Sequence, residues 1–166
     1  QYGHGDIEAG FKEADVVVDT SDLNVHQLRD RVVSIFGGES PHLHLRVHVT
    51  SFGFKHGVPI DVDCMFDCRF LPNPHWIDEL RPQTGLDDPV AGFILRQDVT
   101  RPFLMELERL YGMLIPHYVR EGKAYLNVAF GCTGGRHRSV VMAEQFAAIL
   151  RRQGLDPTVT HRDIGK

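Results

Sequence analysis

The chain has 166 residues, of which 42% are apolar, and its formal net charge is −4 at pH 7. This length and apolar fraction predict one domain with its own core, together with a fragment of a second domain. The charge excludes the strongly basic balance that marks a nucleic-acid-binding protein by composition alone. No apolar run reaches the length of a membrane-spanning helix, and no signal peptide is recognisable, so no membrane association is expected.

Charge is unevenly distributed along the chain. Residues 1–41 hold 3 Lys or Arg against 8 Asp or Glu, whereas residues 118–166 hold 8 against 4. The C-terminal third is therefore expected to face anions.

The three cysteines, Cys64, Cys68 and Cys132, are an odd number without a disulfide framework. This usage predicts a reducing, cytoplasmic location. Cys64 and Cys68 are separated by three residues and no second cysteine pair follows, so a zinc site has only weak support, and no metal is expected.

The N-terminal elements are few. Residues 14–19 are rich in valine and predict a strand, and Asn24 with Gln27 forms a capping box that predicts a helix over 25–36. Residues 37–41 resemble a linker, so we place a domain boundary there. One strand and one helix cannot make a core, so this segment either docks on the main domain or ends another domain.

Residues 42–50 alternate strictly between leucine or valine and polar side chains, which predicts a strand with one buried face. The polar face carries His42, His44 and His48. Three histidines on one strand face can bind a metal, but a solvated polar face is the favoured interpretation.

The remaining elements alternate between strands and helices. In chain order, we first expect a loop over 51–57, a strand over 64–70 ending near Arg69 and a proline-rich loop from 71. A short helix over 90–97 and a longer helix from Thr100, which Pro116 kinks or ends, follow. The chain then continues with a strand over 125–130, a helix from Ser139 that stops at Gly154, and a strand over 158–161. This order predicts an α/β fold with a largely parallel sheet and flanking helices. Ligands bind at the C-terminal ends of such strands, which gathers Lys55, Arg69, His75 and the loop 131–139 on one rim.

The loop from Gly131 to Ser139 joins the predicted 125–130 strand to the next helix and contains three glycines. The first N–H groups of a helix lack backbone partners, and the helix dipole adds positive potential there. Arg136 and Arg138 can add charge-assisted hydrogen bonds to phosphate oxygens, and His137 can add one more. The loop therefore predicts an anion cradle, although a glycine-rich turn with surface arginines is a blander alternative.

Several motifs resemble the C-terminal domain of the RapZ/YvcJ family of bacterial RNase adapter or nucleotide-binding proteins. They are Ser51-Phe-Gly-Phe-Lys55-His-Gly, Asp67-Cys-Arg-Phe-Leu-Pro-Asn-Pro-His75-Trp, Arg81-Pro-Gln-Thr-Gly85-Leu, Gly131-Cys-Thr-Gly-Gly-Arg-His-Arg-Ser139 and His161-Arg162. The resemblance covers roughly residues 43–166 and implies a 42–166 domain that is similar to part of phosphofructokinase. Residues 1–37 resemble the end of the family's N-terminal P-loop kinase-like domain plus linker. Because the chain has no Walker A loop, the ATP or GTP site of that domain, and any hydrolysis there, are expected outside this chain.

The resemblance implies a non-catalytic sensor that binds an amino-sugar phosphate such as glucosamine-6-phosphate, or a sugar nucleotide. His75 and Thr133 match the family's sugar-phosphate pocket. The expected ligand-binding residues are Lys55, Arg69, Asn73, His75, Gly131, Cys132, Thr133, Gly134, Gly135, Arg136, His137, Arg138 and Ser139.

The implied partners are a small regulatory RNA, an endoribonuclease and further copies of the chain, as a dimer or tetramer. The expected RNA-binding residues are Arg136, Arg138, Arg162 and Lys166. The C-terminus lacks the lysine-rich tail of the enterobacterial relatives and is more like actinobacterial members, so sugar-phosphate binding transfers better than RNA binding.

A rival interpretation is a cysteine-dependent phosphatase, because Cys132 and Arg138 have the Cys-x5-Arg spacing of that class. The histidine that usually precedes the cysteine is replaced by Gly131, and no motif marks a general acid, although Asp63 or Asp67 is available. A bare RNA-binding module is a third alternative. Turnover of an aryl phosphate and the salt dependence of RNA affinity separate the three.

Overall fold

The computed structural model describes residues 17–21, 28, 31–32, 35 and 45–166. The chain divides into two compact units, 1–42 and 43–166, which are described separately. In the first unit, residues 28, 31, 32 and 35 are helical, in agreement with the predicted helix. Residues 17–19 have no regular structure, so the strand predicted over 14–19 is wrong for its described half, and the rest of it lies outside the described residues.

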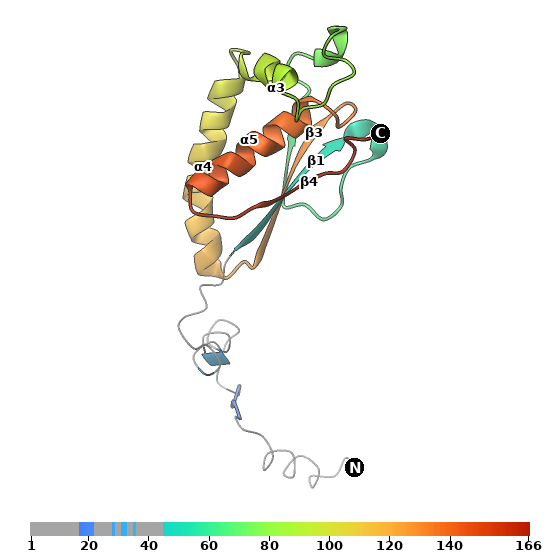
Figure 1. Cartoon of the computed structure of the whole chain (residues 1–166). Helices are drawn as coiled ribbons and strands as arrows, with labels where there is room; N and C mark the ends of the chain where they lie inside the picture. Colours follow the sequence, from blue (N-terminus) through green and yellow to red (C-terminus); the bar gives the residue numbers. More distant parts are fainter. Residues whose placement is uncertain (1–16, 22–27, 29–30, 33–34, 36–44) are drawn as a thin grey trace, which may run out of the picture. The chain divides into compact units, whose positions relative to one another are not determined.

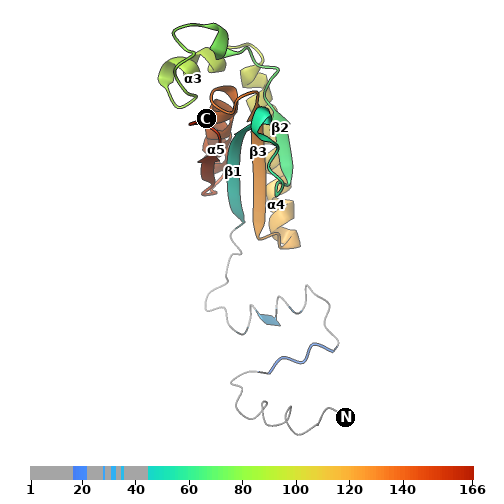
Figure 2. The same ribbon diagram turned by 90° about the vertical axis from the view of Figure 1, so that its right-hand side faces the viewer.

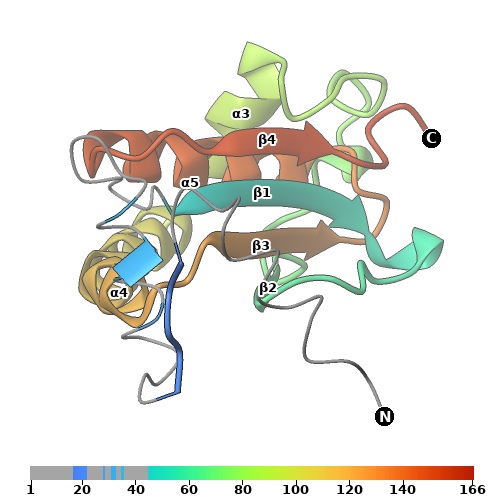
Figure 3. The same cartoon turned by 90° about the horizontal axis from the view of Figure 1, so that it is seen from below.

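A four-stranded sheet forms the centre of the second unit. Its strands are β1 (Arg46–Gly53), β2 (Cys64–Asp67), β3 (Tyr125–Cys132) and β4 (Thr158–His161). They lie in the order β2-β3-β1-β4, and every pairing is parallel; the order can be followed in Figure 3. The predicted α/β fold with a parallel sheet is therefore confirmed, whereas the likeness to phosphofructokinase stays a prediction.

The helices are α3 (Asp88–Leu95), α4 (Thr100–Glu121) and α5 (Arg138–Arg152) (Figure 1). In Figure 2, α4 and α5 lie behind the strands, on one face of the sheet. This placement agrees with right-handed crossovers, since both helices connect strands in the same direction across the sheet. Within the described part of the chain, no helix combines the length and apolar character needed to cross a membrane.

The core lies between this sheet face and the helices. Alternate residues of β1 and β3 are buried, among them Val47, Val49, Leu126 and Val128, while Arg46 is exposed and His48 is half-buried. The predicted alternation is confirmed over the described residues 45–50. His42 and His44 lie outside the described residues.

Helix α5 is more deeply buried than its predicted apolar stripe implied. Met142, Phe146, Ile149 and Leu150 are buried as expected. The first turn is buried as well, from Arg138 to Val141, because it packs beneath the loops that follow the strands. The end of α5 near Gly154, which has a positive φ of 85°, agrees with the predicted stop.

The structure decides two limits. Helix α4 continues through Pro116 to Glu121, so of the two expected effects of Pro116, ending the helix is excluded and a kink stays a prediction. The carbonyl that loses its donor there belongs to Gly112, which is exposed and can be hydrated. Strand β1 continues to Gly53, so the segment predicted as a loop begins only with the 3-10 turn η1 (Phe54–His56).

The C-terminal ends of the strands meet at one rim. β1 leads into η1, and β3 leads into the glycine-rich loop before α5. β2 ends at Asp67, so Arg69 lies in the turn after the strand and not within it. The 3-10 turn η2 (Pro74–Trp76) follows, and Asn73 caps it by accepting the His75 N–H at 3.3 Å.

Candidate functional site

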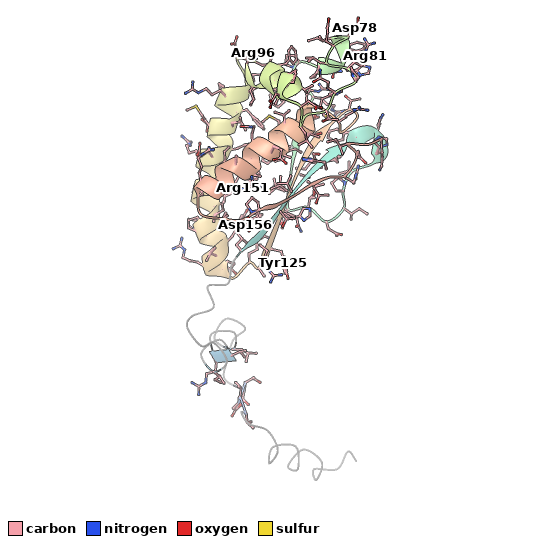
Figure 4. The ribbon with its side chains drawn as sticks, in the orientation of Figure 1. Asp78, Arg81, Arg96, Tyr125, Arg151 and Asp156 are labelled. Atoms are coloured by element: carbon pink, nitrogen blue, oxygen red, sulfur yellow. The ribbon has the colours of Figure 1, made fainter. Side chains whose placement is uncertain are left out.

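A cavity of about 410 Å³ opens at this rim. Its walls come from η1, the η2 loop, the loop before α5 and the C-terminal residue. The lining residues are Lys55, Asn73, His75, Trp76, Arg81, Cys132, Thr133, Gly134, Arg136, His137, Arg138 and Lys166. In Figure 4, Arg81 lies at the end of the unit toward which the strands run, and Tyr125, at the start of β3, lies at the other end.

Most residues of the predicted ligand site line this one cavity. His75 and Thr133 do so although they are far apart in sequence, as predicted. Four predicted residues are not among the lining side chains: Arg69, Gly131, Gly135 and Ser139. Trp76 and Arg81 line the cavity and were missed as ligand-binding residues, although the sequence placed both in the motifs that carry the family resemblance. Lys166, expected only for RNA, also lines it.

The glycine-rich loop packs its backbone directly against the end of β1. A Cβ at Gly53 would lie 2.5 Å from the carbonyl carbon of Gly134. Gly135 has a φ of +76°, and a Cβ there would lie 2.5 Å from the Gly53 nitrogen. Gly131 serves packing as well, because its Cβ would lie 2.5 Å from Cζ of Phe52. Gly131 and Gly135 therefore shape the loop without lining the cavity.

The N-terminus of α5 has no side-chain cap. His137 occupies the N-cap position and its side chain makes no capping hydrogen bond. The first N–H groups of the helix consequently have neither a backbone nor a cap acceptor. Together with the helix dipole, these donors create a site with affinity for an anion.

The Lys55 side chain lies over this loop. Its Nζ is 3.9 Å from the point where a Cβ on Gly134 would lie. The Lys55 backbone N–H donates to the Thr133 carbonyl at 3.2 Å. Among the described residues, the Lys55 ammonium has no ion-pair or hydrogen-bond partner. It is therefore an exposed cation that lines the cavity beside Gly134, in the loop that leads to the uncapped helix end.

Arg138 is committed to backbone carbonyls, which the sequence did not anticipate. Its Nη1 donates to the carbonyls of Arg69 (3.1 Å) and Leu71 (3.0 Å), and its Nη2 donates to Thr133 Oγ1 (3.2 Å). The buried Nε has no hydrogen-bond partner among the described residues. Arg138 thus ties the loop after β2 to the glycine-rich loop, and its charge acts on the cavity from the wall.

Arg136 is committed in a similar way. Its Nε donates to the carbonyl of Gln83 at 3.2 Å and its Nη2 to that of Pro82 at 2.6 Å. The Gly85 N–H donates back to the Arg136 carbonyl at 2.9 Å, so the segment from Arg81 to Gly85 is fastened to the loop. The fold thus takes up two of the five N–H groups of Arg136 and three of those of Arg138, and the expected hydrogen bonds from the remaining groups to a phosphate stay a prediction.

His137 is buried, and its Nε2 has no hydrogen-bond partner by distance and angle among the described residues. Burial lowers the pKa of His137, and the neighbouring Arg136 adds to this, while the carbonyls of Gln83 and Arg81 oppose it. The imidazole is therefore neutral at pH 7 and contributes a neutral polar group to the cavity wall.

Arg69 belongs to a separate surface cluster. It forms a bidentate ion pair with Asp67, with Nη2 2.7 Å from Oδ2, and its guanidinium lies 4.2 Å from the centroid of the Phe54 ring. Hydrogen bonds from Arg69 lower the pKa of Asp67. Only the Arg69 carbonyl reaches toward the site, as an acceptor for Arg138.

The C-terminal residues are anchored by Asp163, which is fully buried. Its carboxylate accepts hydrogen bonds from the Gly53 N–H (2.8 Å), Arg162 Nη2 (2.7 Å) and Lys166 Nζ (2.7 Å). Burial by itself raises the pKa of Asp163, but these hydrogen bonds outweigh it and hold the pKa well below its usual value. Arg162 does not line the cavity, and Lys166 reaches it while paired to Asp163.

The thiol of Cys132 is buried at the base of the loop. Its Sγ accepts the Gly135 N–H at 3.3 Å and lies 3.2 Å from Ser139 Oγ. Cys68 is also buried, and burial raises the pKa of its thiol. Within the described ranges, no group of three or more His, Cys, Asp or Glu is placed to hold a metal.

Known proteins resemble this chain over most of its length. The sequence model of the RapZ C-terminal domain matches residues 45–165. A nucleotide-binding protein of Thermobifida fusca is 52% identical over 154 residues, which cover 93% of this chain and 52% of the relative. Nucleotide-binding proteins of Acidothermus cellulolyticus and Streptomyces griseus are 49% and 47% identical, over 92% and 93% of this chain and 50% and 46% of the relatives.

The chain thus spans about half the length of the curated relatives it matches. The part that the family model covers, residues 45–165, contains the sheet, the three helices and nearly all of the cavity wall. By this match and by the motifs that build its cavity, the chain belongs to the RapZ C-terminal domain family.

Proposed function

We propose that this domain is a non-catalytic sensor that binds a phosphorylated sugar, either an amino-sugar phosphate such as glucosamine-6-phosphate or a sugar nucleotide. The observation that carries the proposal is that the Lys55 ammonium, the Gly134 backbone and the loop leading to the uncapped N-terminus of α5 line the same cavity. A cation, a glycine backbone and free helical N–H groups are together the set of groups that bind a phosphate.

The rest of the cavity suits the remainder of such a ligand. Its volume of about 410 Å³ falls in the range of small-molecule sites. Polar side chains, among them Asn73, His75 and Thr133, line it beside the cations and can bond hydroxyl groups. The four arginine and lysine side chains that line it in addition to Lys55 add positive potential, even where their donors are committed.

The environment of Cys132 supports a binding role over catalysis. A phosphatase of the Cys-x5-Arg class needs the arginine donors aimed at the phosphate, but those of Arg138 bond the carbonyls of Arg69 and Leu71. We therefore place the phosphatase alternative second.

In the wider protein, we propose that ligand binding here regulates amino-sugar and cell-envelope precursor synthesis in the cytoplasm, in a homo-oligomer. The relatives are named nucleotide-binding proteins. Their nucleotide binds either in this cavity, as a sugar nucleotide, or in the half of those proteins that this chain does not span. A small RNA and an endoribonuclease stay proposed partners. The commitment of Arg136, Arg138 and Arg162 to intrachain hydrogen bonds weakens the assignment of these residues to RNA.

Titration calorimetry with inorganic phosphate, glucosamine-6-phosphate and a uridine-diphosphate amino sugar tests the proposal. We expect Lys55→Ala to weaken the tightest of these ligands by about tenfold or more, as expected for one charge-assisted hydrogen bond. Arg151→Ala is the matched control, because it removes one exposed charge in the last turn of α5, at the other end of that helix. Equal effects of the two variants, or no binding of any phosphate compound, would overturn the proposal.

A further inference from the structure

Trp76 is the single tryptophan of the chain, and its residue is 77% exposed although it lines the cavity. An indole held in water leaves a large apolar surface uncovered. The one ring contact found for it is a near-perpendicular contact with His75, with centroids 5.7 Å apart. Among the described residues, no aromatic ring stacks in parallel on the indole.

The backbone holds Trp76 firmly in this exposed place. Asn73 caps η2, Pro74 is buried, and the Trp76 N–H donates to the Asn73 carbonyl at 3.2 Å. Arg81 Nε then donates to the His75 carbonyl at 3.0 Å, and Arg81 pairs with Asp78 at 2.7 Å. Such a short, braced turn presents its side chain at low cost in conformational entropy.

The cavity therefore has two chemically different walls. Lys55, Gly134 and the start of α5 form the wall that attracts an anion. Trp76 forms an aromatic wall on another loop. No Asp or Glu is among the lining residues, so the sugar part of a ligand is recognised by contact and by hydrogen bonds.

We infer that Trp76 is the platform on which the pyranose ring of the bound sugar phosphate lies, and that it selects a sugar phosphate over a bare phosphate. This inference rests on the proposed function. The C–H groups of one face of a pyranose gain dispersion contact with an indole face, whose negative quadrupole attracts them.

The neighbours of Trp76 favour a sugar over a nucleobase. Asn73 lines the cavity and its Oδ1 accepts the His75 N–H, so its amide NH₂ is left as a donor that a hydroxyl oxygen can accept from. A nucleoside diphosphate brings a second phosphate, whereas Lys55 is the lining cation whose donors are all uncommitted among the described residues. One phosphate and one sugar ring match the two walls.

The fluorescence of the 166-residue chain tests the inference, because all tryptophan emission comes from Trp76. We expect glucosamine-6-phosphate to change the emission and inorganic phosphate to leave it unchanged. Calorimetry on Trp76→Ala should show about five- to tenfold weaker binding of the sugar phosphate, with unchanged affinity for inorganic phosphate. Trp76→Phe, which keeps an aromatic face, should recover most of the affinity.

Four results would overturn the platform. The first is an unchanged affinity of Trp76→Ala for the sugar phosphate, and the second is an equal emission change with phosphate and with sugar phosphate. The third is Trp76-dependent binding of uridine monophosphate that is tighter than binding of the sugar phosphate. The fourth is an altered sedimentation coefficient in Trp76→Ala without a change in sugar-phosphate binding. The third would assign the indole to a base, and the fourth to a contact between copies. The proposed function fails separately, if the unaltered chain binds no phosphate compound at all.

Discussion

Removing the Asp163 carboxylate tests how the C-terminal residues support the phosphate site. Asp163→Ala leaves the buried Gly53 N–H without its acceptor, which costs about 1–3 kcal/mol. The ion pairs with Arg162 and Lys166 add less, about 0.5–1 kcal/mol together, because those side chains are 30% and 53% exposed and can turn to solvent. We expect the free energy of unfolding to fall by about 1.5–4 kcal/mol.

Urea denaturation measures this loss, with Glu106→Ala as the control. Glu106 forms an exposed ion pair with Arg109 at 3.7 Å, so its removal should change the free energy of unfolding by less than about 0.5 kcal/mol. Asp163→Asn, which keeps the shape and one acceptor oxygen, should lie between Asp163→Ala and the unaltered chain. A loss for Asp163→Ala no larger than that for Glu106→Ala would refute the reasoning.

The same carboxylate gives the stability a defined pH dependence. The hydrogen bonds to Asp163 hold its folded-state pKa below the unfolded value of about 3.9. The carboxylate therefore contributes its stabilisation above about pH 4 and loses it as the pH falls toward the folded-state pKa. The stability difference between the unaltered chain and Asp163→Ala should narrow below about pH 4; a difference that stays constant down to about pH 2 would contradict the assignment.

Three further outcomes are expected. Gly53→Ala should abolish detectable phosphate binding in calorimetry, because its Cβ would meet the Gly134 backbone at 2.5 Å. Gly112→Ala is the control and should bind phosphate normally, because its Cβ would lie 3.4 Å from the flexible Gln153 side chain. Normal binding by both variants would contradict this packing. Crystals grown from sulfate should hold an anion at the loop 131–139, and water alone there would count against the cradle. The chain should not hydrolyse an aryl phosphate, and turnover that is lost in Cys132→Ser with the fold intact would promote the phosphatase.

RNA binding is predicted from the basic C-terminal third of the chain and is tested independently of sugar-phosphate binding. Phosphate contacts release counterions, so such binding should weaken steeply with salt in a filter assay. Binding that is insensitive to salt and survives charge reversal at Arg136 and Arg138 would refute an electrostatic mode.

Local patterns in the sequence were sufficient for most of the fold. Strand β4 forms over the predicted residues 158–161, and α5 begins one residue before Ser139. These patterns depend on side chains two to four residues apart, which is the range over which strand and helix periodicity act. The limits that local patterns left open, such as whether α4 ends at Pro116, depend on whether a freed carbonyl is exposed, which is a property of the packed structure.

The sequence by itself determined that a glycine-rich loop opens a helix at the rim of a parallel sheet, and hence where an anion is expected. Only the tertiary structure decided which side chains remain available to it. Arg136 bonds the carbonyls of residues 82 and 83, and Arg138 bonds those of residues 69 and 71. Trp76 and Lys166 join the predicted Lys55 in the cavity wall. A side chain's donors are committed by whichever acceptors the fold brings within hydrogen-bond distance, and here those acceptors come from segments more than fifty residues away in the chain.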